Sequence, residues 1–236
     1  MIISHKYKFI YFKTRKTAST SVEIVLSQFC GENDVITPIS PEDEKKRQKL
    51  GFLGPQNYKV PLKYYSKSDW LNLITNKKRK LFYNHATAAY IKSCIPEQTW
   101  NNYFKFTFER NPFDKAISLY YYDRTSRESL SITDYLNSVK DYKLSNWEIY
   151  TINNQIMLDF IGRYENIDND LTKIKKKLGI SEELKLPKAK SNFRKSNNHY
   201  SSVLNSEDRD QIEVICASEI AEFDYRWNDV KNNSGD

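Results

Sequence analysis

Short apolar runs alternate with amphipathic stretches along most of this 236-residue chain. An apolar run between polar segments is typical of a buried strand. Four such runs predict strands, and they cover residues 9–12, 81–83, 103–109 and 158–164. Because residues 103–109 alternate aromatic with other side chains, we expect this strand to lie at the centre of the sheet.

Apolar residues at intervals of three and four positions predict helices between these strands. In the segment 20–29, for example, Val22, Val25, Leu26 and Phe29 fall on one helical face. The predicted helices cover residues 20–29, 86–94, 112–122, most of 131–158, 168–178 and 206–222. Strands that alternate with helices predict an α/β fold, with a central, mainly parallel sheet that is flanked by helices on both faces.

Residues 31–80 break this pattern. Proline and glycine recur throughout the segment, and a run of mainly charged residues covers positions 42–49. Such punctuation is typical of irregular structure, so we expect an insertion with one or two short helices rather than a second domain. We therefore predict a single domain over residues 1–236 that carries this insertion.

The charge balance is positive. The chain has 37 Lys and Arg against 30 Asp and Glu, which gives a net charge of +7 and an isoelectric point near 9.0. A positive surplus favours an anionic partner, which can be a nucleotide, a nucleic acid, a membrane surface or an acidic glycan. Charge alone does not choose among these four classes.

Cysteine usage favours a reducing compartment. Cys30, Cys94 and Cys216 lie far apart and form no zinc or redox spacing, and their odd number argues against a disulfide framework. No cluster of His, Cys, Asp and Glu has the spacing of metal ligands, so we predict no metal site. Since no long apolar stretch is present, we expect a cytoplasmic protein without a membrane anchor.

The segment 13–21 is rich in Lys, Ser and Thr, and it lies between a predicted strand and a predicted helix. A helix N-terminus presents free N–H groups and partial positive charge, to which hydroxyls and a lysine add an anion site. The segment lacks the glycines of the GxxxxGK[ST] loop of ATP-binding proteins. The alternative is a helix capped by Ser19 or Thr20, with a solvated lysine beside it.

A second polar pair follows the central strand. Arg110 comes directly after that strand, and Ser118 lies on the helix that we expect to begin at Pro112. A guanidinium can bind a phosphate through two hydrogen bonds, and a serine hydroxyl can add a third. The alternative is an ion pair of Arg110 with Glu109 or Asp114, with Ser118 packed against the sheet.

These two segments resemble the nucleotide-binding motifs of sulfotransferases that use 3′-phosphoadenosine 5′-phosphosulfate (PAPS). The sequence KTASTS resembles the 5′-phosphosulfate loop and is especially similar to that of heparan sulfate 2-O-sulfotransferases, although Arg15 stands where the family often has a proline. The segment 106–121, FTFERNPFDKAISLYY, resembles the 3′-phosphate motif. Weaker resemblances lie in FIGRYEN (160–166) and EIAEFDYRW (219–227).

The resemblance implies a P-loop-like sulfotransferase fold. It also implies transfer of a sulfuryl group from PAPS to a hydroxyl of a carbohydrate acceptor, with the nucleotide PAP as product. It implies that the nucleotide contacts the following residues: Lys16, Thr17, Ala18, Ser19, Thr20, Ser21, Arg110 and Ser118. The acceptor's identity and the oligomeric state stay open.

Two residues are candidates for catalysis. His85 follows the predicted strand 81–83, at the edge where α/β sheets present ligand-facing groups. The resemblance implies that it acts as the base, while a backbone-bonded histidine at a helix start is the alternative. Lys16 is expected to stabilise charge on the leaving phosphate. His5 is expected to be exposed, and His199 lies in a late basic loop.

Two other functions remain as alternatives. A P-loop-type kinase requires glycines in its phosphate-binding loop and a carboxylate side chain that binds magnesium. A nucleic-acid-binding module requires a concentrated basic face. Acidic residues are interspersed along this chain, so we expect no nucleic-acid partner.

The three tyrosines at residues 120–122 are expected to lie in the core. The late-loop residues that could close a nucleotide site are Lys188, Lys190, Arg194 and Lys195.

Overall fold

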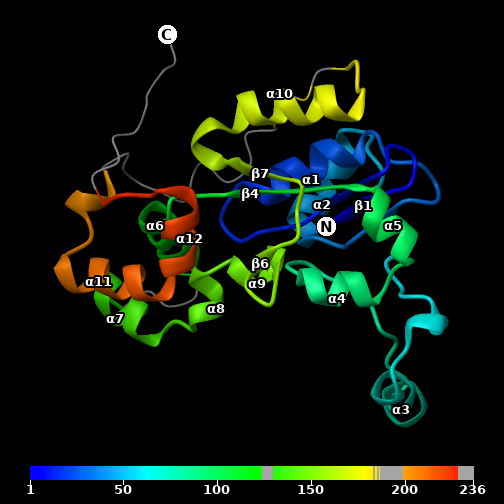
Figure 1. The fold of residues 1–236 in the computed structure, drawn as a ribbon, viewed down its shortest axis with the longest axis horizontal. Helices are drawn as coiled ribbons and strands as arrows, with labels where there is room; N and C mark the ends of the chain where they lie inside the picture. Colours follow the sequence, from blue (N-terminus) through cyan, green and yellow to red (C-terminus); the bar gives the residue numbers. More distant parts are fainter. Residues whose placement is uncertain (124–129, 183, 185, 187–198, 228–236) are drawn as a thin grey trace.

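A five-stranded sheet lies at the centre of the computed structural model, which describes residues 1–123, 130–182, 184, 186 and 199–227 (Figure 1). Its strand order is β3-β1-β2-β4-β7. The strands are β1 Ile2–Ser4, β2 Phe9–Tyr11, β3 Val35–Ile36, β4 Phe104–Glu109 and β7 Phe160–Arg163. The predicted strands 9–12, 103–109 and 158–164 are therefore confirmed, with β4 one strand from the edge and paired on both sides.

The sheet is mixed rather than mainly parallel. β2, β4 and β7 run parallel, as predicted, but β1 is antiparallel to both β2 and β3. A tight turn over residues 5–8 joins β1 to β2, and so short a connection permits only antiparallel pairing. Asp34 holds this turn by accepting hydrogen bonds from the backbone N–H of His5 and the hydroxyl of Ser4.

The predicted strand 81–83 is wrong. Only Leu81 makes a bridge in this segment, with Lys59. Two hydrogen bonds to the insertion hold it, since Phe82 N–H donates to the carbonyl of Tyr58 and Val60 N–H donates to that of Lys80. The segment pairs with the insertion instead of the central sheet, so its apolar residues, of which Phe82 is buried, do not indicate a sheet strand.

Three of the predicted helices follow parallel strands as expected. These are α1 Ser19–Ser27, α6 Pro112–Asp123 and α10 Ile167–Leu178. Gly179 ends α10 with a φ of 66°, a left-handed conformation that glycine adopts without steric cost. A shorter helix, α4 Ala88–Ser93, lies within the predicted segment 86–94, and α5 Glu97–Asn102 precedes β4.

Two segments differ from the predicted helices. The segment 206–222 forms two helices, α11 Ser206–Ile215 and α12 Ala217–Phe223, with the break at Cys216. The segment 131–158 holds α7 Ile132–Ser138, α8 Asp141–Leu144 and α9 Trp147–Tyr150. A hairpin of β5 Thr151–Ile152 and β6 Gln155–Ile156 then follows. Asn153 and Asn154 both have positive φ, which the tight turn of a two-residue hairpin requires.

The predicted insertion divides into two parts. β3 belongs to the sheet, and α2 Pro41–Lys49 carries Arg47, which is fully buried beside Glu23. The rest, including a 3-10 turn at Leu62–Tyr64 and α3 Lys67–Asn76, projects from the body (Figure 1). Only this second part behaves as an irregular insertion.

The core lies on both faces of the sheet. Phe9, Tyr11, Phe106 and Phe108 face one side, in a cluster that includes residues of α1 and α10. Their neighbours Ile10 and Phe12 face the other side with residues of α4, as the two-residue period of strands requires. A third cluster joins α6, α7 and α11. All three cysteines are free and buried.

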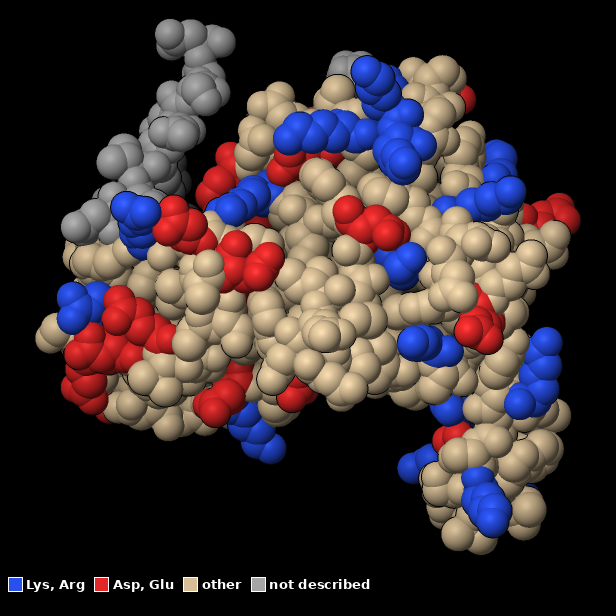
Figure 2. Space-filling view, in the orientation of Figure 1, with Lys and Arg blue, Asp and Glu red and all other residues tan. Residues whose placement is uncertain are grey.

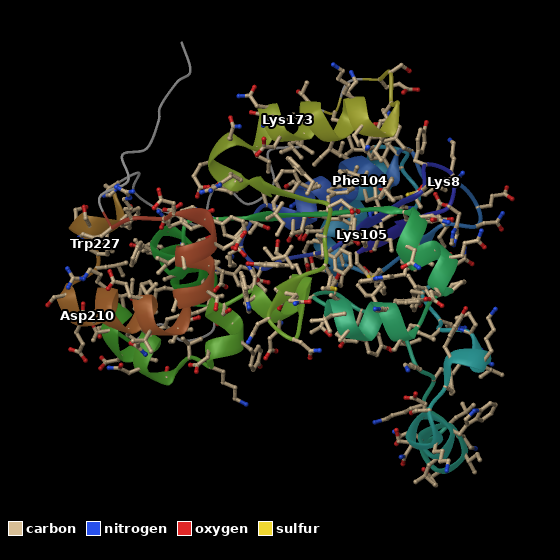
Figure 3. All side chains as sticks on the ribbon, viewed as in Figure 1. Lys8, Phe104, Lys105, Lys173, Asp210 and Trp227 are labelled. Atoms are coloured by element: carbon tan, nitrogen blue, oxygen red, sulfur yellow. The ribbon has the colours of Figure 1, made fainter. Side chains whose placement is uncertain are left out.

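Figure 3 shows how the side chains fill these layers, with Phe104 and Lys105 on β4 and Trp227 on the helical part formed by α6, α7 and α11. Trp227 packs edge-on against Phe113 of α6, with ring centroids 4.9 Å apart. Of the helices that the structure describes, none has both the length and the apolar character needed to cross a membrane.

Candidate active site

The loop between β2 and α1 rests on the central strand. Phe12 N–H donates to the carbonyl of Phe106 and thereby extends the β2–β4 pairing by one residue. The Thr14 hydroxyl then lies 2.8 Å from that of Thr17 and also bonds to the carbonyl of Phe108. These buried hydroxyls hold the loop at the carboxyl ends of β2 and β4, where open α/β sheets bind ligands.

The start of α1 is open to an anion. Its N-cap is Ala18, which has no side chain that could bond to the first N–H groups, and its first turn holds no acidic residue. The alternative of a cap by Ser19 or Thr20 is therefore wrong. Lys16 and Ala18 have φ of 61° and 55°, and such left-handed residues turn successive N–H groups toward one side of a loop. The helix dipole adds partial positive charge there.

Three segments that are distant in sequence bind the backbone of this loop. The His85 ring nitrogen Nδ1 lies 2.8 Å from the carbonyl oxygen of Lys13. Asn146 accepts from the N–H of Arg15 at 2.8 Å and donates to its carbonyl oxygen at 3.2 Å. Arg110 Nη1 donates to the carbonyl oxygen of Lys16 at 3.0 Å. The structure thus brings Lys16, His85 and Arg110 to one loop.

Arg110 is buried at the join of β4 and α6. Its guanidinium pairs with Asp114 through Nε and Nη2 and lies over the ring of Tyr164, 4.1 Å from the ring centroid. An ion pair with Asp114 or Glu109 was the predicted alternative to phosphate binding by Arg110. The structure has the pair with Asp114, whereas Glu109 accepts a hydrogen bond from the backbone N–H of Arg110. The FIGRYEN segment, which supplies Tyr164, therefore contributes to this site.

One face of α6 points toward the loop. Asp114, Ser118 and Tyr122 are spaced four residues apart, so they lie on the same side of the helix. Asp114 contacts Arg110, while the ring of Tyr122 lies under the Lys16 ammonium, 4.0 Å from it. Ser118 lies between these two contacts, and its hydroxyl has no hydrogen-bond partner among the described residues. Tyr122 is 41% exposed, so it is not the core residue we predicted.

His85 is held as a neutral ring. It has a φ of 62° and precedes Thr87, the N-cap of α4, so it lies in a turn rather than at a helix start. Because a carbonyl only accepts, Nδ1 carries the proton and Nε2 keeps its lone pair. Burial, assisted by the positive charge of Arg15, lowers the pKa of His85 to about 3. The imidazole is therefore unprotonated at neutral pH, with the lone pair of Nε2 available.

Arg15 adds a positive charge beside His85, and Glu148 partly balances this charge. Burial lowers the pKa of its guanidinium, which lies over the exposed ring of Tyr142 at 5.5 Å. Within the described ranges no carboxylate pairs with Arg15, and its side-chain N–H groups have no hydrogen-bond partner. A half-buried guanidinium without a hydrogen-bond partner is costly, so this group is suited to an anionic or hydroxylated ligand.

A group of buried charged side chains supports the site from the interior of the protein. Lys115 of α6 pairs with Glu109 at 3.1 Å and lies 3.8 Å from Glu219 of α12, with all three side chains almost fully buried. Asn146 connects this group to the loop, since it donates to Glu109 at 3.1 Å. Sequence reasoning missed Asn146, because a single asparagine ahead of a short helix carries no recognisable pattern. Glu219 lies in EIAEFDYRW, so the closing helix helps to hold the site.

Other predicted residues lie apart from this site. His5 is exposed, as expected, and bonds to the hydroxyl of Tyr103. His199 caps a 3-10 turn by accepting from the N–H of Ser201. Lys188, Lys190, Arg194 and Lys195 fall outside the described residues. Within the described part of the chain, no three His, Cys, Asp or Glu side chains gather as metal ligands would.

Comparison with known protein families gives a match over most of the chain. Residues 1–226 match a model described as "Sulfotransferase family". A protein from Archaeoglobus fulgidus, named only "Uncharacterized protein", is 36% identical over 113 residues, which is 44% of this chain and 94% of that protein. No solved structure gives a significant match.

Proposed function

We propose that this chain, which belongs to the sulfotransferase family, moves a sulfuryl group from PAPS to a hydroxyl of a carbohydrate. The observation that carries this proposal is the loop held by three segments. Lys13, Arg15 and Lys16 are bound through their backbones by His85, Asn146 and Arg110 respectively. A candidate base, a phosphate-binding loop and a candidate phosphate-binding arginine therefore converge.

The residues present suit a phosphosulfate donor. The uncapped start of α1 supplies N–H groups from Ser19, Thr20 and Ser21, and Lys16 supplies a charge beside it. Thr17 uses its hydroxyl to bond to Thr14, so it would offer only its N–H. When bound, PAPS supplies an activated sulfuryl group, and Arg110 with Ser118 would bind its 3′-phosphate.

His85 and Lys16 would act on opposite sides of the transfer. The Nε2 lone pair of His85 would accept the proton of the acceptor hydroxyl. The ammonium of Lys16 would neutralise negative charge that develops on the leaving phosphate oxygen. The stack of Lys16 on Tyr122 limits the positions that this ammonium can take.

A carbohydrate acceptor suits the surface around His85. Tyr83, Tyr122 and Tyr142 are each between 41% and 52% exposed, and exposed aromatic rings can pack against sugars. Tyr122 and Tyr142 contact Lys16 and Arg15 respectively, so they border the site. Arg15 would bind an acidic group of such a sugar. A P-loop kinase receives less support, because the loop has no glycine.

Calorimetry of two nucleotides tests the assignment of Arg110. Arg110→Ala should weaken binding of PAP by roughly 1.5–3 kcal/mol, the worth of a charge-assisted hydrogen bond. Binding of adenosine 5′-phosphosulfate, which lacks the 3′-phosphate, should change far less. Arg209→Ala, which removes a partly exposed arginine on α11, is the matched control.

Because Arg110 also holds the backbone of Lys16, a second variant separates the two roles. Ser118→Ala removes only a partly exposed hydroxyl and should weaken PAP binding by about 0.5–1.5 kcal/mol. Binding of adenosine 5′-phosphosulfate should be unaffected. Equal losses for both nucleotides in both variants would show that neither residue binds the 3′-phosphate.

A further inference from the structure

Residues 61–80, which we call the basic arm, expose an apolar surface that nothing in the described structure covers. Its helix α3 contains no buried residue. Leu71 is 62% exposed, Ile74 is 74% exposed, and Trp70 is 42% exposed. Three large apolar side chains on one short projecting helix differ from the scattered exposed residues of an ordinary surface.

The apolar residues of α3 share one face. At 3.6 residues per turn, Trp70, Leu71 and Ile74 fall within roughly a 100° arc. The opposite side is polar and carries Ser68, Asn72, Thr75 and Asn76. α3 is therefore an amphipathic helix whose apolar face points away from the protein, although an isolated helix of this length is marginal in water.

The basic arm is fastened at its base rather than packed along its length. Ser66 and Asp69 form a capping box at the start of α3. Lys80 pairs with Asp69 at 3.0 Å, and the N–H of Lys80 donates to the hydroxyl of Tyr65. The Tyr65 ring in turn packs against Trp70. These contacts fix the direction of the helix but leave Leu71 and Ile74 exposed.

The basic arm has a large net positive charge compared with the chain as a whole. Residues 61–80 contain six basic residues and one acidic residue, a net charge of +5 out of +7 for the whole chain. The acidic residue, Asp69, is already paired with Lys80. Figure 2 shows basic side chains around the tan surface of the arm at the lower right of the molecule.

We propose that the basic arm binds the surface of an anionic lipid bilayer. Apolar side chains on one face and lysines around it are the features with which a helix lies in a membrane interface. Since α3 has 10 residues, it is about 15 Å long and would lie in the surface rather than span it. Lys67, Lys78 and Arg79 would contact the anionic headgroups.

The charge of the arm argues against a second copy as its partner, and the apolar face of α3 argues against a nucleic acid. A second copy that paired arm to arm would bring two segments of +5 together, which is electrostatically unfavourable. A nucleic acid would use the charges and Trp70 but would leave Leu71 and Ile74 in water. A bilayer satisfies both the apolar face and the charge.

The site and the arm are connected directly. The chain leaves the arm at Lys80 and reaches His85 five residues later, with Leu81 and Tyr83 partly exposed on the way. Binding of the arm would therefore hold the loop of Lys16 near the membrane surface. The membrane proposal does not depend on the proposed sulfuryl transfer, and its test needs no activity assay.

Vesicle flotation of the full chain tests the proposal. The protein should float with vesicles of phosphatidylcholine mixed with phosphatidylglycerol, and much less with phosphatidylcholine alone. Binding should fall at about 1 M salt, where the Debye length is about 3 Å. Leu71→Gln combined with Ile74→Gln should reduce binding at least about tenfold. Val214→Gln, which changes a 78% exposed valine of α11, is the matched control.

A second pair of variants tests the charge. Lys67, Lys78 and Arg79 changed together to Gln should lower binding on the order of 100-fold. The control changes Lys175, Lys176 and Lys177 of α10 to Gln, which gives the same net charge. This helix, on which Figure 3 labels Lys173, lies far from the arm. The control should have a much smaller effect. Lys80 is kept, because its pairing with Asp69 supports α3.

Three outcomes would overturn the proposal. The first is that the wild type fails to float with anionic vesicles. The second is that both arm variants float as the wild type does. The third is that the wild type is a dimer by light scattering and the variant Leu71→Gln with Ile74→Gln is a monomer, which would assign the apolar face to a second copy. Circular dichroism of both arm variants should match the wild type, since their changed side chains are exposed.

Discussion

The ring of His85 donates one proton to the carbonyl of Lys13, and this contact decides which nitrogen is available for chemistry. The sequence indicated a histidine close to the site by resemblance, but it could not indicate the left-handed φ of 62° or the bonded carbonyl. The bonded carbonyl belongs to Lys13, which is 72 positions away. The conformation of His85 is therefore a product of the tertiary structure, and it makes the proposed base testable.

Replacement of His85 should separate its two possible roles. His85→Ala should lower kcat by about 10²–10⁴-fold, the usual contribution of a positioned base, and PAP affinity should fall less, through loss of the contact to the Lys13 carbonyl. His85→Asn can keep a donor toward the Lys13 carbonyl but cannot act as a base, so it should be as inactive as the alanine variant. A sulfate-transfer assay measures both. An active asparagine variant would show that His85 only holds the loop.

The pH dependence of folding should follow from the lowered pKa of His85. The unfolded chain binds a proton on this ring near its ordinary pKa of 6.5, whereas the folded protein does so only near 3. The free energy of unfolding should therefore decrease as the pH falls from about 6.5 toward 3, and this contribution should be absent in His85→Asn. Thermal melts of both proteins between pH 7 and pH 5 provide the measurement.

Identical slopes for the two proteins would contradict the lowered pKa. The lowered pKa also affects the pH dependence of kcat/KM, a parameter that reports ionisable groups of the free enzyme. Protonation of His85 should therefore cause no decrease of kcat/KM near pH 6.5.

At the scale of elements, the order of strand, loop and helix at residues 9–29 followed from local pattern, but the partners of the loop did not. Asn146 lies on the turn before α9 and is fully buried. Its side chain bonds to Arg15 and Glu109, and its N–H donates to Glu219 of α12. One side chain thus joins the loop to β4, and its backbone joins α9 to α12.

Loss of Asn146 should disturb both stability and ligand binding. Asn146→Ala would leave the N–H of Arg15 and one oxygen of Glu109 with fewer partners, at a cost of about 1–3 kcal/mol for a buried polar group. PAP affinity should fall as well, because the loop loses a support. Urea denaturation and calorimetry measure the two effects. Asn137→Ala, on the exposed side of α7, should change neither.

At the scale of the whole molecule, most long periodic segments were predictable and most of the shortest elements were not. α1, α6, α10 and β4 carry enough residues to show a period. β1 and β3 have three and two residues, so no period is visible, and their antiparallel pairing depends on the turn at residues 5–8. The two phosphate motifs predicted site residues that the fold brings to one loop. The buried charges that connect them come from separate elements and have no local pattern.

The buried group of Lys115, Glu109 and Glu219 connects β4, α6 and α12, so its disruption should affect the whole fold. Lys115→Met keeps the volume but leaves two buried carboxylates without their cation, which should cost about 3–5 kcal/mol at neutral pH. Burial, with the charge of Glu219, already raises the pKa of Glu109, whereas Lys115 lowers it.

Without the lysine, the pKa of Glu109 should rise further, and the folded protein should take up a proton more readily than the unfolded chain. A group whose pKa is raised on folding stabilises the fold as the pH falls, so the deficit of Lys115→Met should be largest near pH 8 and smaller near pH 5. Urea denaturation at both values measures it, with the exposed Lys176→Met as control. A deficit that is equal at the two pH values would mean that lost packing, rather than unpaired charge, destabilises the variant.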